Sequence, residues 1–192
     1  MIWRLIFLAV MLVFVGIRAR FRRVWASIPR QGTRPLRERV LTTLVVLGQS
    51  VPALLWLGGD ALSAAQLPLP EPLRALGALL CALSLGLLWW IHSALGAHFS
   101  PRLELWEGHA LIQSGPYQWV RHPMYSAGFV QILGYGLLTA NLVVFVAPLV
   151  ALTLLVALRL PDEERMLEER FGEDWRRWRD RTGRLIPRLP RG

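Results

Sequence analysis

A polar and aromatic segment, HALIQSGPYQWVRHPMY at residues 109–125, lies between two long apolar stretches of the chain. Gly115-Pro116 is typical of a turn, and His122-Pro123 indicates extended backbone, because a residue before proline is disfavoured in the helical region. Such backbone leaves N–H and C=O groups free, which near a bilayer is tolerated only where they line a cavity or meet a ligand. The segment also contains three large aromatic residues: Tyr117, Trp119 and Tyr125. The combination suits a flat heteroaromatic ligand with polar edges.

Metal and disulfide chemistry find little support in the sequence. The single cysteine, Cys81, lies within an apolar run, so we interpret it as a buried packing residue. No pair of histidines has metal-ligand spacing, and no nucleophile–base triad stands out. The four histidines are His92, His98, His109 and His122. We therefore expect no metal site.

Apolar stretches must position the polar segment. Apolar residues make up 54% of this 192-residue chain, which predicts a membrane protein. Three spans are expected at Ile2–Ile17, Val40–Gly59 and Leu73–Ala94, each near the ~20 residues that cross a bilayer. Met124–Leu160 is too long for one crossing and divides at Thr139–Asn141 into a helical hairpin. The prediction is an all-α integral membrane protein with five transmembrane helices.

The arginines predict the orientation of these spans. Residues 18–39 contain eight arginines and one acid, Glu38, whereas the loop from Asp60 to Glu71 has no basic residue. The positive-inside rule then places the first loop and the C-terminus in the cytoplasm and the N-terminus outside. We expect a multi-pass protein of a prokaryotic inner membrane. We attribute the net charge of +9 to basic residues that set the membrane topology and contact lipid headgroups, and we expect no nucleic acid as a partner.

A charged segment, DEERMLEERFGEDWRRWRD, follows the last apolar stretch. Four of its apolar residues recur at helical spacing and share one face: Leu167, Phe171, Trp175 and Trp178. This pattern predicts a C-terminal amphipathic helix that lies against the membrane surface or under the other helices.

Two motifs carry a resemblance to a known family. GPYQWVRHPMY resembles the G-x-Y-x-x-x-R-H-P-x-Y signature of the isoprenylcysteine carboxyl methyltransferase and phospholipid methyltransferase superfamily. RLPDEERMLEERFGEDWRRW resembles that family's downstream R-x-x-x-E-E and Phe-Gly-Glu element, in the same order and around a helical hairpin. The resemblance covers residues 98–187 and indicates a short prokaryotic member.

The resemblance implies S-adenosyl-L-methionine as the cofactor and a lipophilic or lipidated acceptor that enters from the bilayer. Arg159 matches the family's substrate-facing arginine and, with Glu163, forms the implied catalytic pair. A carboxylate such as Glu163 also suits the cofactor's sulfonium and ammonium groups. Arg102 stands where eukaryotic members have a glutamine, so no contact is carried over there. The implied cofactor contacts are His109, Ala110, Leu111, Ile112, Tyr117, His122, Pro123, Met124, Tyr125 and Glu163.

Pro161 leaves two local geometries open. A helix that continues through it places Arg159 and Glu163 on one face, four residues apart, where they can pair. A helix that begins there places Glu163 in a first turn beside the cofactor loop and leaves Arg159 at the bilayer edge. We favour the second geometry, with Glu163 holding the cofactor and Arg159 orienting the acceptor.

Structural interpretations compete with these assignments. Arg121 can reach headgroup phosphates as well as a ligand, and His122 can cap the helix that follows. Glu164 fits a solvated face with intrahelical partners such as Arg165 and Arg170.

We expect one integrated domain, with three spans in residues 1–95 and the catalytic part in residues 96–192. The leading function is carboxyl methylation of an isoprenylcysteine-like acceptor at the cytoplasmic face. The alternatives are an NADPH-dependent reductase of the steroid-reductase-like membrane fold and a non-catalytic membrane binding protein. The sequence identifies neither the acceptor group, whether carboxylate, amine or thiol, nor the oligomeric state.

Overall fold

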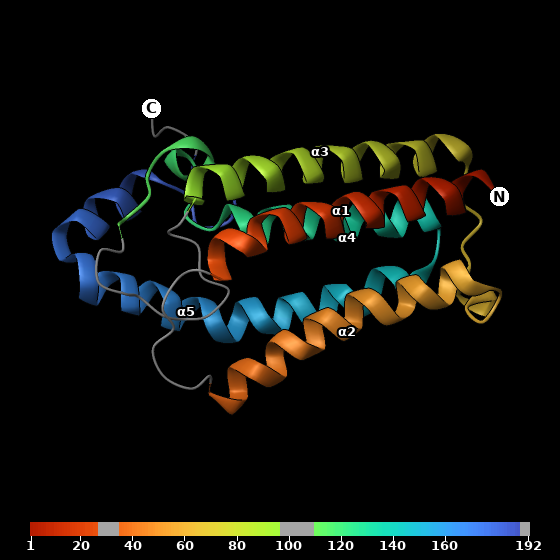
Figure 1. Ribbon diagram of the computed structural model, residues 1–192, viewed down its shortest axis with the longest axis horizontal. Coiled ribbons are helices and arrows are strands. Elements are labelled where there is room, and N and C mark those ends of the chain that lie inside the picture. Colours follow the sequence, from red (N-terminus) through yellow and green to blue (C-terminus); the bar gives the residue numbers. More distant parts are fainter. Residues whose placement is uncertain (27–34, 97–109, 189–192) are drawn as a thin grey trace.

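Helices form nearly all of the structure that the computed structural model describes, which comprises residues 1–26, 35–96 and 110–188. Figure 1 shows α1, α3 and α4 running alongside one another, with α2 and α5 beneath them. Within the described residues the long helices are α1 (Ile2–Ala26), α2 (Leu36–Gly58), α3 (Glu71–Leu95), α4 (Pro123–Thr139) and α5 (Leu142–Arg181), and the short 3₁₀ helices are η1 (Ser63–Ala65) and η3 (Gly115–Gln118).

The described helices agree with the predicted all-α membrane fold. Among them α1, α2, α3 and α5 are long and apolar enough to cross a bilayer. The fifth, α4, has 17 residues, a length of about 25 Å at ~1.5 Å per residue. Successive helices alternate in direction (Figure 1), as the predicted topology requires. The largest difference in the boundaries is at the end of α1, which runs to Ala26 instead of ending at Ile17, because arginine is a good helix former and extends the helix beyond its apolar part.

The predicted hairpin turn is confirmed between α4 and α5. Ala140 adopts left-handed backbone with φ of 52°, and the Asn141 side chain accepts hydrogen bonds from the backbone N–H groups of Val143 and Val144. The Gln66 amide closes the same end of the bundle by donating to the carbonyl of Thr139 at 2.8 Å. A polar cap of this kind satisfies the free groups at the helix ends.

Two glycines allow α3 and α4 to pack at close range. A Cβ on Gly77 would clash with the backbone nitrogen of Leu138, and one on Gly134 would lie 2.7 Å from the sulfur of Cys81. Cys81 itself is fully buried at this seam, as expected. Small residues bring backbones together where the surrounding lipid offers no hydrophobic drive for association.

The favoured geometry at Pro161 is wrong, because α5 continues through it. Arg37 of α2 braces this point: its guanidinium donates to the carbonyl of Leu158 at 2.6 Å and pairs with Asp162 at 3.1 Å. Proline removes one backbone N–H from a helix, and a neighbouring side chain can satisfy a carbonyl that is loosened there.

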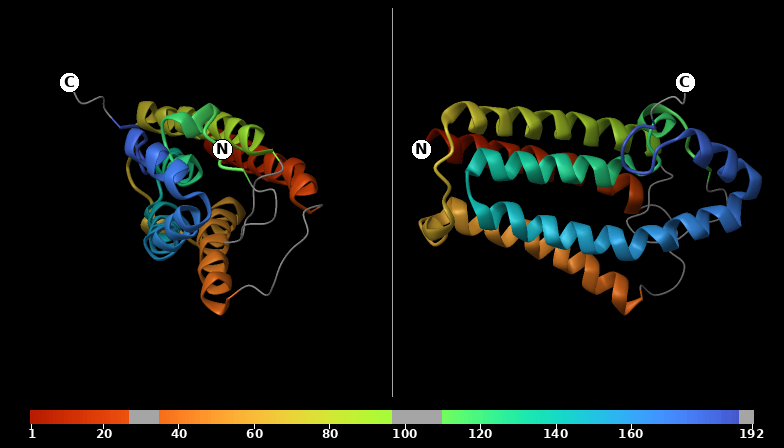
Figure 2. Two further views of the ribbon diagram at one scale, coloured as in Figure 1. Left: turned by 90° about the vertical axis from the view of Figure 1, so that its left-hand side faces the viewer. Right: turned by 180° about the vertical axis from the view of Figure 1, so that it is seen from behind.

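The direction of α5 changes instead at Gly172, whose φ of 50° is left-handed. The helix turns back at this residue, and its last turns lie beside η3 (Figure 2). The predicted apolar face forms there, with Trp175 and Trp178 buried and Leu167 and Phe171 packed against them. This face therefore packs against other elements of the protein.

Candidate functional site

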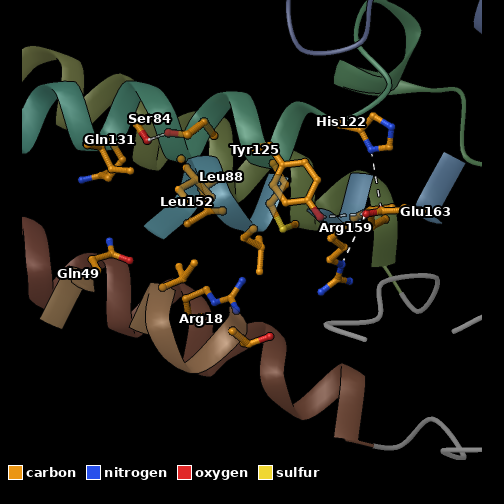
Figure 3. Close-up of a pocket in the computed structure, with 18 of the residues that line it drawn as sticks. Arg18, Gln49, Ser84, Leu88, His122, Tyr125, Gln131, Leu152, Arg159 and Glu163 are labelled. Carbon is orange, nitrogen blue, oxygen red and sulfur yellow. Dashed lines mark hydrogen bonds and ion pairs between the residues drawn. The ribbon is translucent and has the colours of Figure 1, made fainter. Parts of the chain in front are cut away.

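A cavity of about 480 Å³ opens where the segment before η3 meets α1, α2, α3, α4 and α5. Its volume lies in the range of small-molecule sites. Figure 3 shows charged and aromatic side chains at one end, including His122, Tyr125, Arg159 and Glu163, and neutral polar side chains at the other. The cavity therefore connects the residues of the sequence motifs to the interior of the helix bundle.

Most residues of the predicted cofactor set meet in this cavity. Those that line it are Ala110, Leu111, Ile112, Tyr117, His122, Met124, Tyr125 and Glu163, and the predicted substrate-facing Arg159 lines it as well. Pro123 does not line it and instead occupies the first turn of α4. His109 and Arg102 lie outside the described residues. Residues 110–113 form neither helix nor strand.

Glu163 stands at the centre of the charged end. The Tyr125 hydroxyl donates to its carboxylate at 2.9 Å. The Arg159 Nε lies 3.7 Å from the same carboxylate, and the His122 Nδ1 lies 3.9 Å from its other oxygen. The start of α4 and the preceding turn of α5 thus direct polar groups at one carboxylate, which fixes its position while leaving room on its cavity side.

Arg159 lies between two carboxylates from different helices. Besides Glu163 it faces Glu38 of α2, with 3.5 Å between the Nη1 and Oε1 atoms. The side chains of Arg159 and Glu38 are only 12% and 10% exposed. A buried cation needs such partners, because burial without them is costly. The sequence identified Glu38 only as the lone acid of a basic loop, and nothing in the local pattern linked it to α5.

Glu164 is not part of a solvated face, contrary to the structural interpretation of the sequence. It pairs with Arg121 at 3.1 Å, with His122 at 3.2 Å and with Arg184 at 2.8 Å. Partial burial opposes its ionisation, but the hydrogen bond from His122 and the charges of His122, Arg121 and Arg184 outweigh that and lower the pKa of Glu164 to about 2. It therefore stays charged in this network, beyond the apolar part of α5.

Arg121 serves as a clamp between the motif segment and the C-terminal residues. Its guanidinium donates to the backbone carbonyls of Arg179 at 2.9 Å and Thr182 at 2.6 Å, in addition to Glu164. Its side chain is only 9% exposed, so it does not extend to headgroup phosphates. The residues of the RHP motif therefore have different roles. Arg121 connects the loop to the returning end of α5, and His122 lies between the carboxylates of Glu163 and Glu164.

Tyr117 contributes a neutral aromatic surface. Burial raises the pKa of Tyr117 well above its ordinary value, and the nearby Glu163 and Tyr125 act in the same direction. Its backbone carbonyl accepts a hydrogen bond from the indole of Trp178 at 3.0 Å. The phenol thus remains protonated, and it suits contact with a ligand better than proton transfer.

The sequence analysis did not anticipate that Arg18 of α1, Gln49 of α2 and Gln131 of α4 would line the cavity. A recognisable signal was available for the glutamines, since each interrupts an otherwise apolar span. No cluster of three or more potential metal ligands occurs within residues 1–26, 35–96 and 110–188.

Residues 73–174, just over half of the chain, match the sequence profile of the phospholipid methyltransferase family. The chain belongs to this family. The match includes α3, the motif loop, α4 and α5 as far as the Gly172 turn, which are the elements around the charged end of the cavity.

Two curated relatives match shorter stretches of this family member. The cobalt-zinc-cadmium resistance protein CzcN of Cupriavidus metallidurans is 34% identical over 83 residues, which cover 43% of this chain and 38% of CzcN. The uncharacterized protein YpbQ of Bacillus subtilis is 28% identical over 81 residues, which cover 42% of this chain and 48% of YpbQ. The matched stretch thus spans less than half of either relative.

A solved structure resembles nearly the whole of this family member. The eukaryotic intramembrane Ras methyltransferase ICMT, an isoprenylcysteine carboxyl methyltransferase, superposes with a TM-score of 0.61 over 95% of this chain and 66% of its own, at 22% identity. At this identity the likeness establishes the fold. It agrees with the predicted superfamily and with a multi-pass membrane protein.

Proposed function

We propose that this protein is a membrane methyltransferase that uses S-adenosyl-L-methionine and transfers the methyl group to a lipophilic acceptor. One observation carries the proposal: the two family motifs meet at the charged end of a cavity whose remainder lies among apolar helices. A single space of this kind can hold a polar cofactor at one end and a lipid chain at the other.

The residues at the charged end suit this cofactor. S-adenosyl-L-methionine carries sulfonium and ammonium cations and, when bound, supplies an activated methyl group. The Glu163 carboxylate matches those cations. Tyr117, Tyr125 and Trp178 offer aromatic faces, which attract cations and stack with a heteroaromatic base. We propose that these residues, together with the rest of the predicted set, hold the cofactor.

The protein's own groups would mainly hold and orient the reactants. Arg159 is positioned to bind an anionic group on the acceptor, and Glu38 and Glu163 hold its guanidinium in place. The buried setting strengthens such charge contacts by excluding water. A carboxylate acceptor is already a nucleophile and needs no general base, which agrees with a site whose groups supply position and charge.

We further propose carboxyl methylation of an isoprenylcysteine-like acceptor at the cytoplasmic face of an inner membrane. The fold neighbour is an isoprenylcysteine carboxyl methyltransferase, and the Arg-rich loop and tail support this side of the membrane. On this proposal residues 96–192 carry the catalysis and residues 1–95 complete one integrated domain with them.

A labelling experiment tests the proposal. The purified protein is incubated with a membrane lipid extract, or with a prenylcysteine, and S-adenosyl-L-methionine labelled on the methyl carbon. We expect base-labile methyl ester in the lipid fraction and an increase in thermal stability with S-adenosylhomocysteine, because a ligand of the folded state stabilises it. Stabilisation by NADPH alone would support the reductase instead. Stabilisation by neither S-adenosylhomocysteine nor NADPH would support a binding protein.

A further inference from the structure

The end of the cavity away from Glu163 contains neutral polar side chains within membrane-spanning helices. Gln49 of α2 and Gln131 of α4 lie there on opposite walls, and Ser84 of α3 lies near Gln131 (Figure 3). None of the three can carry a charge near neutral pH. Polar groups in the interior of a membrane protein are costly, and they tend to mark a ligand or a transport path.

Gln131 is the polar group without an evident structural role. Its side chain is 2% exposed, and neither amide atom has a hydrogen-bond partner among the described residues. The Tyr135 hydroxyl lies close to the amides of Gln131 and Gln49, but it donates its proton to the sulfur of Met11 at 3.1 Å and so has none for the Gln131 amide oxygen. The Ser84 hydroxyl likewise has no proton for that oxygen, because it donates to the carbonyl of Ala127 at 2.9 Å. An amide oxygen that is buried without a donor destabilises the protein unless something in the cavity binds it.

The residues around Gln131 indicate which kind of chemical group binds its amide. The neighbouring cavity wall is mainly hydrocarbon, with Phe14, Leu88, Ile132 and Leu152 among its residues, and the Arg18 side chain of α1 lies between this part and the charged end (Figure 3). Gln131 follows Tyr125 by six residues on α4, which places it about 9 Å along the helix from the charged end at ~1.5 Å per residue. A chain that enters from the charged end therefore passes a hydrocarbon wall and a lone amide pair part-way along its length.

We propose that Gln131 and Gln49 bind a neutral hydrogen-bonding group, a hydroxyl or a carbonyl, carried within the hydrocarbon chain of the acceptor. This inference rests on the proposed function, since it takes the cavity as the acceptor's binding site. An amide both donates and accepts, so it recognises either group, and its terminal torsion is broad enough to turn toward the cavity. The acceptor is thus an isoprenylcysteine-like lipid whose hydrocarbon chain carries an oxygen, and the glutamines select it over a lipid with a plain hydrocarbon chain.

The test measures displacement of a fluorescent fatty acid from the purified full-length protein by palmitate and by a series of its mid-chain hydroxy isomers. We expect one isomer, with its hydroxyl at the depth of Gln131, to bind about three- to tenfold more tightly than palmitate, the gain typical of one neutral hydrogen bond. If palmitate binds as well as every isomer, or if no isomer displaces the probe, the proposal is overturned.

Variants tie the preference to the glutamines. Gln131→Leu should abolish the preference and bind palmitate at least as well as the wild type, Gln49→Leu should reduce the preference, and Gln118→Leu in the exposed part of η3 should retain it. A preference that survives Gln131→Leu overturns the proposal. Stabilisation by S-adenosylhomocysteine is measured on the same samples: its absence alone would count against the proposed methyltransferase, whereas its presence without a hydroxyl preference would count against the glutamine site.

Discussion

Glu163 and Arg159 form one coupled unit at the level of single residues. The continuous helix puts them on one face, 3.7 Å apart, so each influences the charge that the other presents to a ligand. Tyr125 and His122 hold Glu163 from the loop side, and Glu38 holds Arg159 from α2. Loss of one partner therefore has different consequences for the two ligands of the proposed reaction.

We predict that Glu163→Gln weakens binding of S-adenosylhomocysteine by roughly ten- to a hundredfold, the value of about 1.5–3 kcal/mol for a lost charged contact. Arg159→Ala should leave that affinity unchanged or improve it, because it frees the carboxylate from its neighbour, while it lowers the rate of methyl transfer. Calorimetry gives the affinities, and labelled-methyl turnover gives the rates.

Arg165→Ala provides the control, since Arg165 is an exposed residue of the same helix that pairs only at 3.7 Å with Asp162 among the described contacts. It should change neither quantity. Equal loss of cofactor affinity in Glu163→Gln and Arg159→Ala would show that both residues bind the cofactor and would contradict the separate roles.

At the level of elements, the close packing of α3 against α4 contributes to the folding stability of the protein. A methyl group at Gly77 would lie 2.9 Å from the carbonyl oxygen of Gly134 and 2.8 Å from the Cβ of Leu137, and most of these neighbours are backbone that cannot rotate away. We predict that Gly77→Ala destabilises the protein by about 1–3 kcal/mol, the usual cost of overpacking. Thermal unfolding in detergent measures this.

Gly86→Ala is the matched control, because Gly86 lies on the same helix and a Cβ there meets nothing within 4 Å. It should be neutral or slightly stabilising, as alanine is the better helix former. An equal loss of stability in the two variants would mean that the seam tolerates the added methyl group and that the effect lies elsewhere in α3.

The sequence predicted the helices better than the way they end and bend. Apolar stretches located all five long helices, and Thr139–Asn141 marked the hairpin, where the structure shows the Asn141 side chain capping α5. Pro161 was misleading, since the cost of a proline inside a helix is offset by Arg37 from a distant helix. The turn at Gly172 left no distinctive signal, because one glycine in a charged helix is compatible with either conformation.

At the level of the whole molecule, the motifs identified the charged end of the site and missed its far end. The loop and the start of the charged segment are local patterns, so Tyr117, His122 and Glu163 could be found from residue order alone. Glu38, Gln49 and Gln131 enter the site through packing between helices far apart in sequence. Periodicity shows which residues share a face of one helix, but it does not show which faces of different helices meet.

The orientation in the membrane is the property of the whole molecule that remains to be measured. We predict that the end of the bundle with η1 and the α4–α5 turn is external, and that η3 and the end of α5 are cytoplasmic, because the arginines gather at the second end.

The buried Cys81 is the only cysteine of the chain, so cysteines introduced at exposed positions report cleanly. In intact cells an impermeant maleimide should label Ser63→Cys, whereas it should label Asp174→Cys only after permeabilisation. The unmodified protein gives the background. Labelling of Asp174→Cys in intact cells, with Ser63→Cys protected, would reverse the orientation and would place the charged end of the cavity away from cytoplasmic cofactor.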